Sequence, residues 1–435
     1  MSVLARLAAR APVPVFVAPG LGGSDAACRL LGRSELDVVT SPRHAAVLLV
    51  VGAVTSDLLG PLAQVHDQLA HPRSTVWWSG RPDEPLWAEL PGTAALLTDD
   101  PVPVVSERWR ALLAGDETEP DLGADRPANA WVGVGPFGQG GEGMMGGTPY
   151  GRPMAMTGDD RDGLVLDQLH MRIGPFLPAF PVGLALDVVV QGELVQEVTS
   201  IVDLVANRTG VRGGRIDADD EVFTRALTEI VPIAELELAR ARHHLGALAA
   251  ALVAGGLSSL GFAVAHVAAT SRPDRRDVAR LTRRIAWSGW TGWTNAGLGM
   301  IDEAGAAAMG GPCLRAAGIG EDLRTQQAAY RQLGFAPAVG TRGDVAGRWR
   351  QRLAEVDQSL QIAARAEPLG LVSEPGAVEA PEGPRQADGS GDHEQVGDRL
   401  ADVLADRDWD DFMATIVSLD LRFDVERAGR PLEAA

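Results

Sequence analysis

Residue types that could perform chemistry are scarce in this chain of 435 residues, and what is missing already excludes several reactions. Cys28 and Cys313 are its two cysteines, too few for a four-cysteine zinc or iron–sulfur site or for a disulfide framework. All 39 basic residues are arginine, because the sequence contains no lysine. Schiff-base chemistry and the phosphate-binding lysine of a P-loop are therefore excluded.

Three groups of side chains could instead bind a ligand or partner. Trp287, Trp290 and Trp293 recur every third residue, which indicates a stripe that faces the core or a partner or, alternatively, a stacking site for a ring ligand. The glycine-rich segment 135–147 lacks a strand–glycine–helix context, so a mobile or surface loop is favoured over a phosphate cradle. A basic run indicates a solvated helix face, or a contact with anionic lipid or an acidic partner. That run consists of Arg272, Arg275, Arg276, Arg280, Arg283 and Arg284.

Composition limits the class of protein. The formal net charge is −19, which disfavours free binding to nucleic acid because phosphate backbones are repelled. Hydrophobic residues make up 46% of the chain, enough for a real core, and its length fits two or three domains. Arg6 and Arg10 are followed by no apolar run of signal-peptide length, so we expect a reducing, cytoplasmic location.

The first quarter of the chain has the pattern of a doubly wound α/β domain. Short apolar runs, typical of buried parallel strands, alternate with helix-like stretches. From Ser56 to Leu69 the leucines follow helical spacing. The expected strands are 13–18, 36–39, 46–52 and 74–80.

The second half combines a β-hairpin with helices. Residues 183–190 and 194–202 alternate around a short turn, which predicts the hairpin, and the pattern is helical from about 221 to 366. Between His244 and His266 lie 21 residues without a charge, long enough to span a bilayer. Because this stretch is rich in Ala, Gly and Ser, a buried bundle helix is favoured over a membrane span.

These patterns give a domain layout. We expect a flavodoxin-like, doubly wound α/β domain over 1–115 and a linker rich in Gly, Pro and Asp over 116–163. An α+β domain with the hairpin, or a small sheet, and a mainly helical bundle follows over 164–366. The acidic, Pro- and Gly-rich insert 367–398 is expected to be disordered, since it cannot bury enough surface. Residues 399–435 regain apolar periodicity and should pack back onto the fold.

A series of short motifs occurs in order over about 166–427. The first two are a hairpin over 174–197 and an Arg-x-x-x-His-Leu helix motif formed by Arg240, His244 and Leu245. In this order the motifs resemble the D-type subunit of respiratory complex I, which is related to the large subunit of nickel–iron hydrogenases. The remaining motifs are Gly311-Pro312-Cys313-Leu314-Arg315, Asp322-Leu323-Arg324, Tyr330, Gly343-Asp344, Gln358-Ser359-Leu360 and Ser418-Leu419-Asp420.

Residues 38–80 carry a second resemblance. Ser41-Pro42-Arg43, an apolar strand, a helix and a second strand follow one another there. This order is similar to the B-type subunit of complex I, the equivalent of the hydrogenase small subunit. The resemblance implies a fusion of two subunits that face each other in the electron-transfer arm of that complex.

The metal ligands of these families are missing. Where the B-type family has Cys-x-Gly-Cys-Asp, this chain has Leu21 and Ser24 at the two ligand positions, and Cys28 lies outside them. Arg81 and Pro82 stand where a further ligand is expected, and the cysteine pairs of hydrogenases are absent. The resemblance therefore implies lost cluster and metal sites. Asp25, which persists in the loop, is interpreted as an N-cap of the following helix.

The candidate residues are those that would line a quinone-type cavity. Leu177 and Phe180 occupy the positions of the family's histidines near the quinone head, and neither can protonate a quinone. For the polar candidates, a structural role is the alternative to lining the cavity. In that alternative His244 is a satisfied core histidine, Arg240 pairs with Glu237 or Asp203, and Arg315 forms a structural ion pair. The full set is Phe176, Leu177, Phe180, Arg240, His244 and Arg315.

The resemblance implies a peripheral-arm subunit, of the quinone module, in a membrane-associated complex related to NADH-quinone oxidoreductase or energy-converting hydrogenase. The family implies quinone, NADH and a [4Fe–4S] cluster; we expect no cofactor on the isolated chain. Expected partners are the other peripheral and membrane subunits, and the expected location is the cytoplasmic face of the cell membrane. The alternative is a catalytically inactive scaffold or regulator with the same fold.

Overall fold

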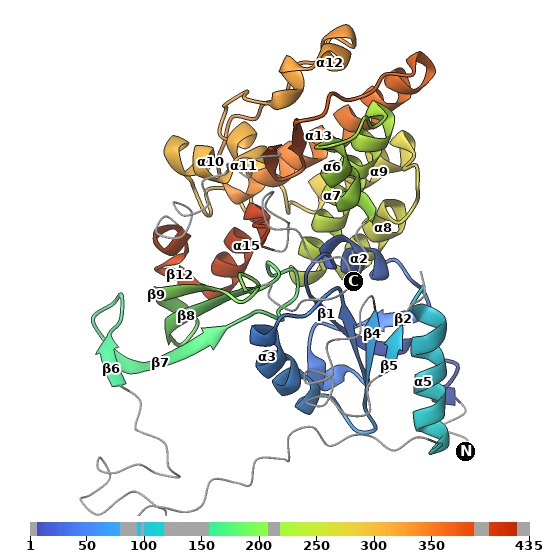
Figure 1. Cartoon of the computed structure of the whole chain (residues 1–435). Helices are drawn as coiled ribbons and strands as arrows, with labels where there is room; N and C mark the ends of the chain where they lie inside the picture. The colour runs from blue at the N-terminus through green and yellow to red at the C-terminus, as the bar shows by residue number, and fades with distance from the viewer. Residues whose placement is uncertain are drawn as a thin grey trace, which may run out of the picture.

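The chain folds into an N-terminal α/β domain and a larger, mainly helical part that carries small sheets (Figure 1). The computed structural model describes residues 7–78, 94–96, 100–116, 156–207, 218–386 and 400–423. The glycine-rich segment 135–147, with Arg81 and Pro82, lies outside the described residues.

The N-terminal domain is built on a parallel sheet with strand order β2-β1-β3-β4-β5. Its central strand β3 (Val47–Val51) is buried along its whole length, as the continuous apolar run predicts. Leu48 and Val50 face one core with α3, while Val47 and Leu49 face the other core with α2 and α5. The other elements are β1 (Val13–Pro19), β2 (Leu36–Val38), β4 (Ser74–Trp78), β5 (Ala94–Leu96), α2 (Ser24–Leu30), α3 (Ser56–Asp67) and α5 (Val102–Ala114).

The loop between β1 and α2 packs directly against the backbone that follows β3. The amide of Leu21 donates to the carbonyl of Ala53 at 2.8 Å, and the amide of Ala53 donates back at 2.9 Å. A Cβ at Gly23 would lie 2.0 Å from the carbonyl oxygen of Val51. Glycine is therefore required at this position by close backbone approach.

Gly23→Ala is expected to lower the free energy of unfolding by about 1–3 kcal/mol, because the added methyl group must displace backbone. Gly60 is the matched control: it lies inside α3, where a Cβ meets nothing within 4 Å. Gly60→Ala should raise stability by about 0.5–1 kcal/mol. Urea unfolding of both variants checks this, and equal effects at the two glycines would contradict the packing described.

A second sheet follows, antiparallel, with strand order β12-β9-β8-β7-β6. Strands β8 (Leu184–Gln191) and β9 (Leu194–Asp203) form the hairpin expected at 183–202, and β7 (Val165–Ile173) pairs with β8. Strand β6 (Met156–Asp159) lies inside the predicted linker 116–163, so ordered structure resumes earlier than its composition indicates. Residues 400–423 contribute β12 (Arg407–Asp408), which pairs with β9, and α15 (Trp409–Leu419), which packs into the core beneath the sheet.

The helical bundle is centred on α7 (Ile233–Ala254) and α13 (Val345–Ala366), which pack against each other (Figure 1). The uncharged stretch between His244 and His266 is not one helix: α7 ends at Ala254, and α8 (Ser258–Ala268) folds back against it. Among the described residues no helix is both long and apolar enough to cross a membrane. The remaining helices are α6 (Ala218–Ala226), α9 (Arg275–Trp287), α10 (Glu303–Met309), α11 (Gly311–Ala316) and α12 (Ala328–Gln332).

The predicted disordered insert 367–398 differs from the structure over its first part. Strands β10 (Ala377–Ala380) and β11 (Gly383–Gln386) form a hairpin, and Val378 and Ala380 join a core with Phe223. Glu379 is buried as well, against Arg315. The composition of the segment was misleading because a few apolar side chains and a buried carboxylate–arginine pair, contributed by distant elements, are enough to order it. Residues 387–398 lie outside the described residues.

Candidate functional site

A cavity lies where the N-terminal domain meets the helical part, with about 160 Å³ of internal space. One wall is the carboxyl-terminal end of β1 with α2. A second is the segment 177–182, and a third is a face of α7 on which His243, Ala247 and Ala250 follow helical spacing. Most of the lining is apolar. Its charged residues are Asp25, His243, Asp420 and Arg422.

His243 lies between two carboxylates at the charged part of the cavity. Its Nδ1 is 2.9 Å from Asp25 Oδ1, and its Nε2 is 2.9 Å from Asp420 Oδ2. Burial by itself would lower the pKa of His243, but these two carboxylates outweigh it and raise the pKa to about 10. His243 is therefore an imidazolium at neutral pH, with both N–H groups donating.

Asp25 is not the N-cap of α2. Gly23 holds that position, and the Asp25 carboxylate points away to His243, with Arg422 at 3.8 Å. Burial would raise the pKa of Asp25, but His243 and Arg422 hold it well below its usual range. Asp420 is likewise held well below its usual pKa by Arg352 and His243, against the effect of burial. Three chain segments, far apart in sequence, thus meet as ionised groups beside the cavity.

His244 is adjacent in sequence and behaves in the opposite way. It is fully buried, and burial, the largest cause, lowers its pKa to about 4 despite the contact with Glu355. Arg352 Nη1 donates to Nδ1 at 3.2 Å, which places the proton of the neutral ring on Nε2, 3.2 Å from Glu355 Oε2. The same Arg352 nitrogen also donates to Asp420 at 2.8 Å. His244 therefore joins the charged groups at the cavity to a second, deeper cluster.

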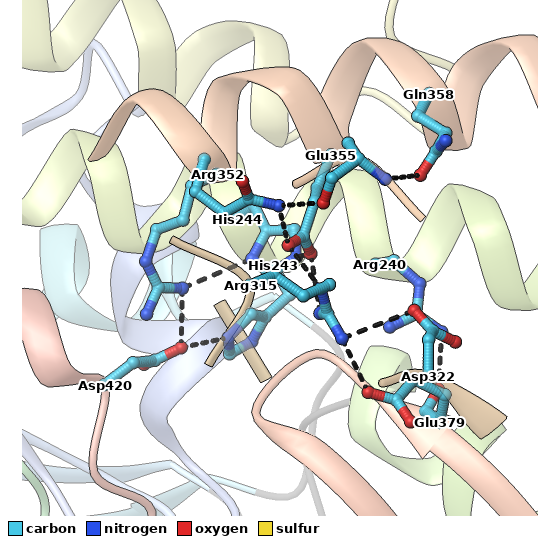
Figure 2. A network of polar contacts seen from close by, with 12 residues as sticks. Arg240, His243, His244, Arg315, Asp322, Arg352, Glu355, Gln358, Glu379 and Asp420 are labelled. Carbon is cyan, nitrogen blue, oxygen red and sulfur yellow. Dashed lines mark hydrogen bonds and ion pairs between the residues drawn. The ribbon is translucent and has the colours of Figure 1, made fainter. Parts of the chain in front are cut away.

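That deeper cluster is a network of buried ion pairs across the bundle (Figure 2). Arg315, on α11, forms a bidentate pair with Glu355 of α13 at 2.8 and 3.0 Å and reaches Glu379 of β10 at 2.8 Å. Asp322 lies 3.3 Å from Arg315 and also accepts from Arg324. Because each of these three carboxylates faces at least one arginine, the network fixes the relative positions of α11, α13 and the β10–β11 hairpin.

Glu237 extends the network along α7. It accepts from the hydroxyl of Tyr330 at 2.6 Å and from Arg324 at 3.2 Å, and it lies 3.4 Å from Arg240 Nε. Arg240 also donates to the backbone carbonyl of Glu379. Burial would raise the pKa of Glu237, but Arg324 and Arg240 lower it to about 2.

The structure divides the residues singled out from the sequence into two groups. Leu177 and Phe180 line the cavity, whereas Phe176 packs into a core shared with the N-terminal domain. Arg240, His244 and Arg315 lie in the buried network and not in the cavity lining. There Arg240 contacts Glu237, and Arg315 pairs with Glu355.

At the two positions that the sequence comparison aligned with cluster ligands, Leu21 is a core residue and Ser24 lines the cavity. Sequence reasoning missed His243, Asp420 and Arg422 as cavity residues. The spacing of His243 with Ala247 and Ala250 is the signal that could have indicated that face.

The side chains present do not provide the ligands of a [4Fe–4S] cluster. Cys28 lines the cavity and Cys313 is buried in the core beneath the second sheet, so two thiols in different places cannot hold a [4Fe–4S] cluster. Among the described residues no group of three or more His, Cys, Asp or Glu side chains is arranged to hold a metal ion. The cavity, apolar with a few charged groups, is of the general kind that binds small organic molecules.

Comparison with known proteins places part of this chain in a family context. Residues 293–382 match the family described as respiratory-chain NADH dehydrogenase, 49 Kd subunit. A D-type subunit of the NADH-quinone oxidoreductase of Salinispora tropica is 41% identical over 73 residues, 16% of this chain and 17% of that protein. The alignment thus spans far less than the length of this relative. The family match contains Arg315, Asp322, Arg324, Glu355 and Glu379, while the cavity residues lie outside it.

Proposed function

We propose that this chain is the quinone-module subunit of an oxidoreductase related to complex I, with B-type and D-type halves fused. The cavity between the two halves is the observation that carries the proposal. The strand order β2-β1-β3-β4-β5, shared with flavodoxin-like sheets, supports a doubly wound first half. Ligands of such sheets bind at the carboxyl ends of the strands, which is where β1 borders the cavity.

The cavity residues have distinct parts in this proposal. A bound quinone would accept electrons and protons on its carbonyl oxygens. Leu177 and Phe180 offer apolar surface to its ring or tail. Protonated His243 and Arg422 offer N–H donors beside the space, while the ionised Asp25 and Asp420 balance their charge. Ser24 offers a hydroxyl donor in the same wall.

Electrons must come from a partner in this proposal, because two separate cysteines cannot hold a cluster on this chain. The proposed partners are the other peripheral and membrane subunits of the complex, with NADH as the distant donor. We place the chain at the cytoplasmic face of the cell membrane. A catalytically inactive scaffold or regulator is the second candidate, favoured by Leu177 and Phe180, which cannot transfer protons.

The proposal predicts saturable binding of a short-chain quinone by the full chain, which equilibrium dialysis can measure. Ala250→Trp would place an indole in the cavity and should reduce the affinity at least about tenfold, since the indole fills the space that the ligand needs. Ala364→Trp, on the exposed face of α13, is the matched control and should bind like the unaltered chain. Equal affinity in both variants would show that quinone binds outside the cavity and contradict the proposal, and no binding by the unaltered chain would favour the scaffold.

A further inference from the structure

The exposed ridge of helix α9 carries one continuous basic stripe. Val278, Leu281 and Ile285 turn inward and pack against the bundle. On the opposite, exposed side of the helix, four residues lie three or four positions apart, a spacing that places them on one helix face. They are Arg276, Arg280, Arg283 and Trp287, and all are exposed.

The arginines of this stripe are poorly neutralised. At the start of the basic run, Arg272 and Arg275 are paired with Glu367 and Asp357. Arg280 pairs with Asp277 on its own helix at 2.7 Å. Within the part of the chain that the structure describes, the remaining three have no carboxylate partner. These are Arg276, Arg283 and Arg284.

Two indole rings protrude at the end of the stripe. Trp287 is 91% exposed and Trp293 is 81% exposed. Trp290, between them in sequence, turns inward and lies 5.1 Å from the ring of Trp349. The three tryptophans therefore do not share one environment: Trp290 is partly buried against the core, and the other two present their large apolar surface to solvent.

We infer that the face formed by Arg276, Arg283, Arg284, Trp287 and Trp293 docks onto an anionic lipid surface. Arginines attract acidic headgroups, and tryptophan favours the interfacial layer, where its apolar ring and its N–H are both accommodated. A headgroup layer accepts protruding rings without a preformed pocket, whereas a protein partner needs a matching cavity for each ring. This favours lipid over an acidic polypeptide.

The charge of the whole chain adds to the specificity of this contact. With a net charge of −19, most of the surface is repelled by an acidic membrane. The basic ridge is then the part that can approach, so it sets the orientation of the docked chain. This inference does not depend on the proposed quinone site, because α9 contributes no residue to the cavity lining.

Co-sedimentation of the full chain with vesicles tests the inference. We expect binding to phosphatidylcholine vesicles that contain phosphatidylglycerol, and none to phosphatidylcholine alone. One arginine near such a surface strengthens binding roughly fivefold, so the triple variant R276Q/R283Q/R284Q should bind about 100-fold more weakly. W287A/W293A should also bind more weakly, and this loss should persist at high salt, where the arginine contribution is screened.

The matched control is R43Q/R110Q/R331Q, which removes the same charge from exposed positions on other elements. Binding of the control should be unchanged, and circular dichroism should give one unfolding temperature for all variants. Equal losses in the control and in the ridge variant would overturn the inference. So would the absence of vesicle binding, or ridge-dependent binding of polyglutamate with none to vesicles. Quinone binding by the ridge variants should equal that of the unaltered chain, because α9 does not line the cavity. The outcome of the vesicle test is therefore independent of the proposed function.

Discussion

Replacing Arg315 with methionine is expected to lower the free energy of unfolding by about 3–5 kcal/mol. Arg315 is fully buried, and its guanidinium faces Glu355, Glu379 and Asp322. Without it, three carboxylates remain in a site that water does not reach, and their mutual repulsion is no longer balanced. Denaturant unfolding monitored by tryptophan fluorescence measures the change.

The control for this variant is an ion pair of similar length at the surface. Arg275 lies 2.8 Å from Asp357, with both side chains about half exposed. Arg275→Gln should cost less than about 1 kcal/mol, because water screens the pair and replaces its contacts. If Arg315→Met cost no more than Arg275→Gln, the buried network would not organise the bundle as described.

The two adjacent histidines are expected to titrate far apart. His243 should remain protonated through neutral pH and lose its proton near pH 10, because Asp25 and Asp420 hold it. His244 should remain neutral until the pH falls to about 4. Carbon–proton NMR of ring-labelled histidine, assigned with single His→Gln variants, measures both titrations directly. Titration of both rings near pH 6.5 would show that neither contact persists in solution.

These titrations also set the pH dependence of stability. Between pH 6.5 and 10 the folded chain holds a proton on His243 that the unfolded chain has released, so stability falls as pH rises. The loss is on the order of 5 kcal/mol over this window, which contains no lysine titration. Between pH 6.5 and 4, His244 is protonated in the unfolded chain but stays neutral in the folded chain. Stability therefore falls as the pH falls through this range.

In His243→Gln, the free energy of unfolding should not show the fall between pH 6.5 and 10 that His243 causes. His44→Gln, at an exposed position on another element, is the matched control and should keep it. An unchanged slope in the His243 variant would assign the alkaline loss to other groups.

The sequence predicted those elements whose hydrophobic pattern is unambiguous. The apolar run at 46–52 identified a central strand, and the alternation around 191–193 identified the β8–β9 hairpin. It could not predict the fold of 367–386, because ordering there depends on Glu379 reaching Arg315, a pairing across 64 positions. The composition of a local segment cannot reveal a contact with a residue so far away in the sequence.

The site was predictable only in part. Resemblance pointed to Leu177 and Phe180, which do line the cavity, and to His244, which lies behind it. Which of two adjacent histidines faces the cavity depends on the rotation of α7, and neighbours on a helix point about 100° apart. Asp25, Asp420 and His243 come from three separate segments, so their meeting is a property of the tertiary fold.

The central claim is that an organic ligand of the quinone type occupies the cavity beside His243. The most direct test is the ring-labelled histidine spectrum of the full chain, recorded while a short-chain quinone is added. We predict that the His243 signals move with the ligand concentration and saturate, while His44, exposed on another element, stays fixed. Ala250→Trp should abolish the movement. Unmoved His243 signals at a concentration where dialysis shows binding would place the ligand elsewhere and contradict the account.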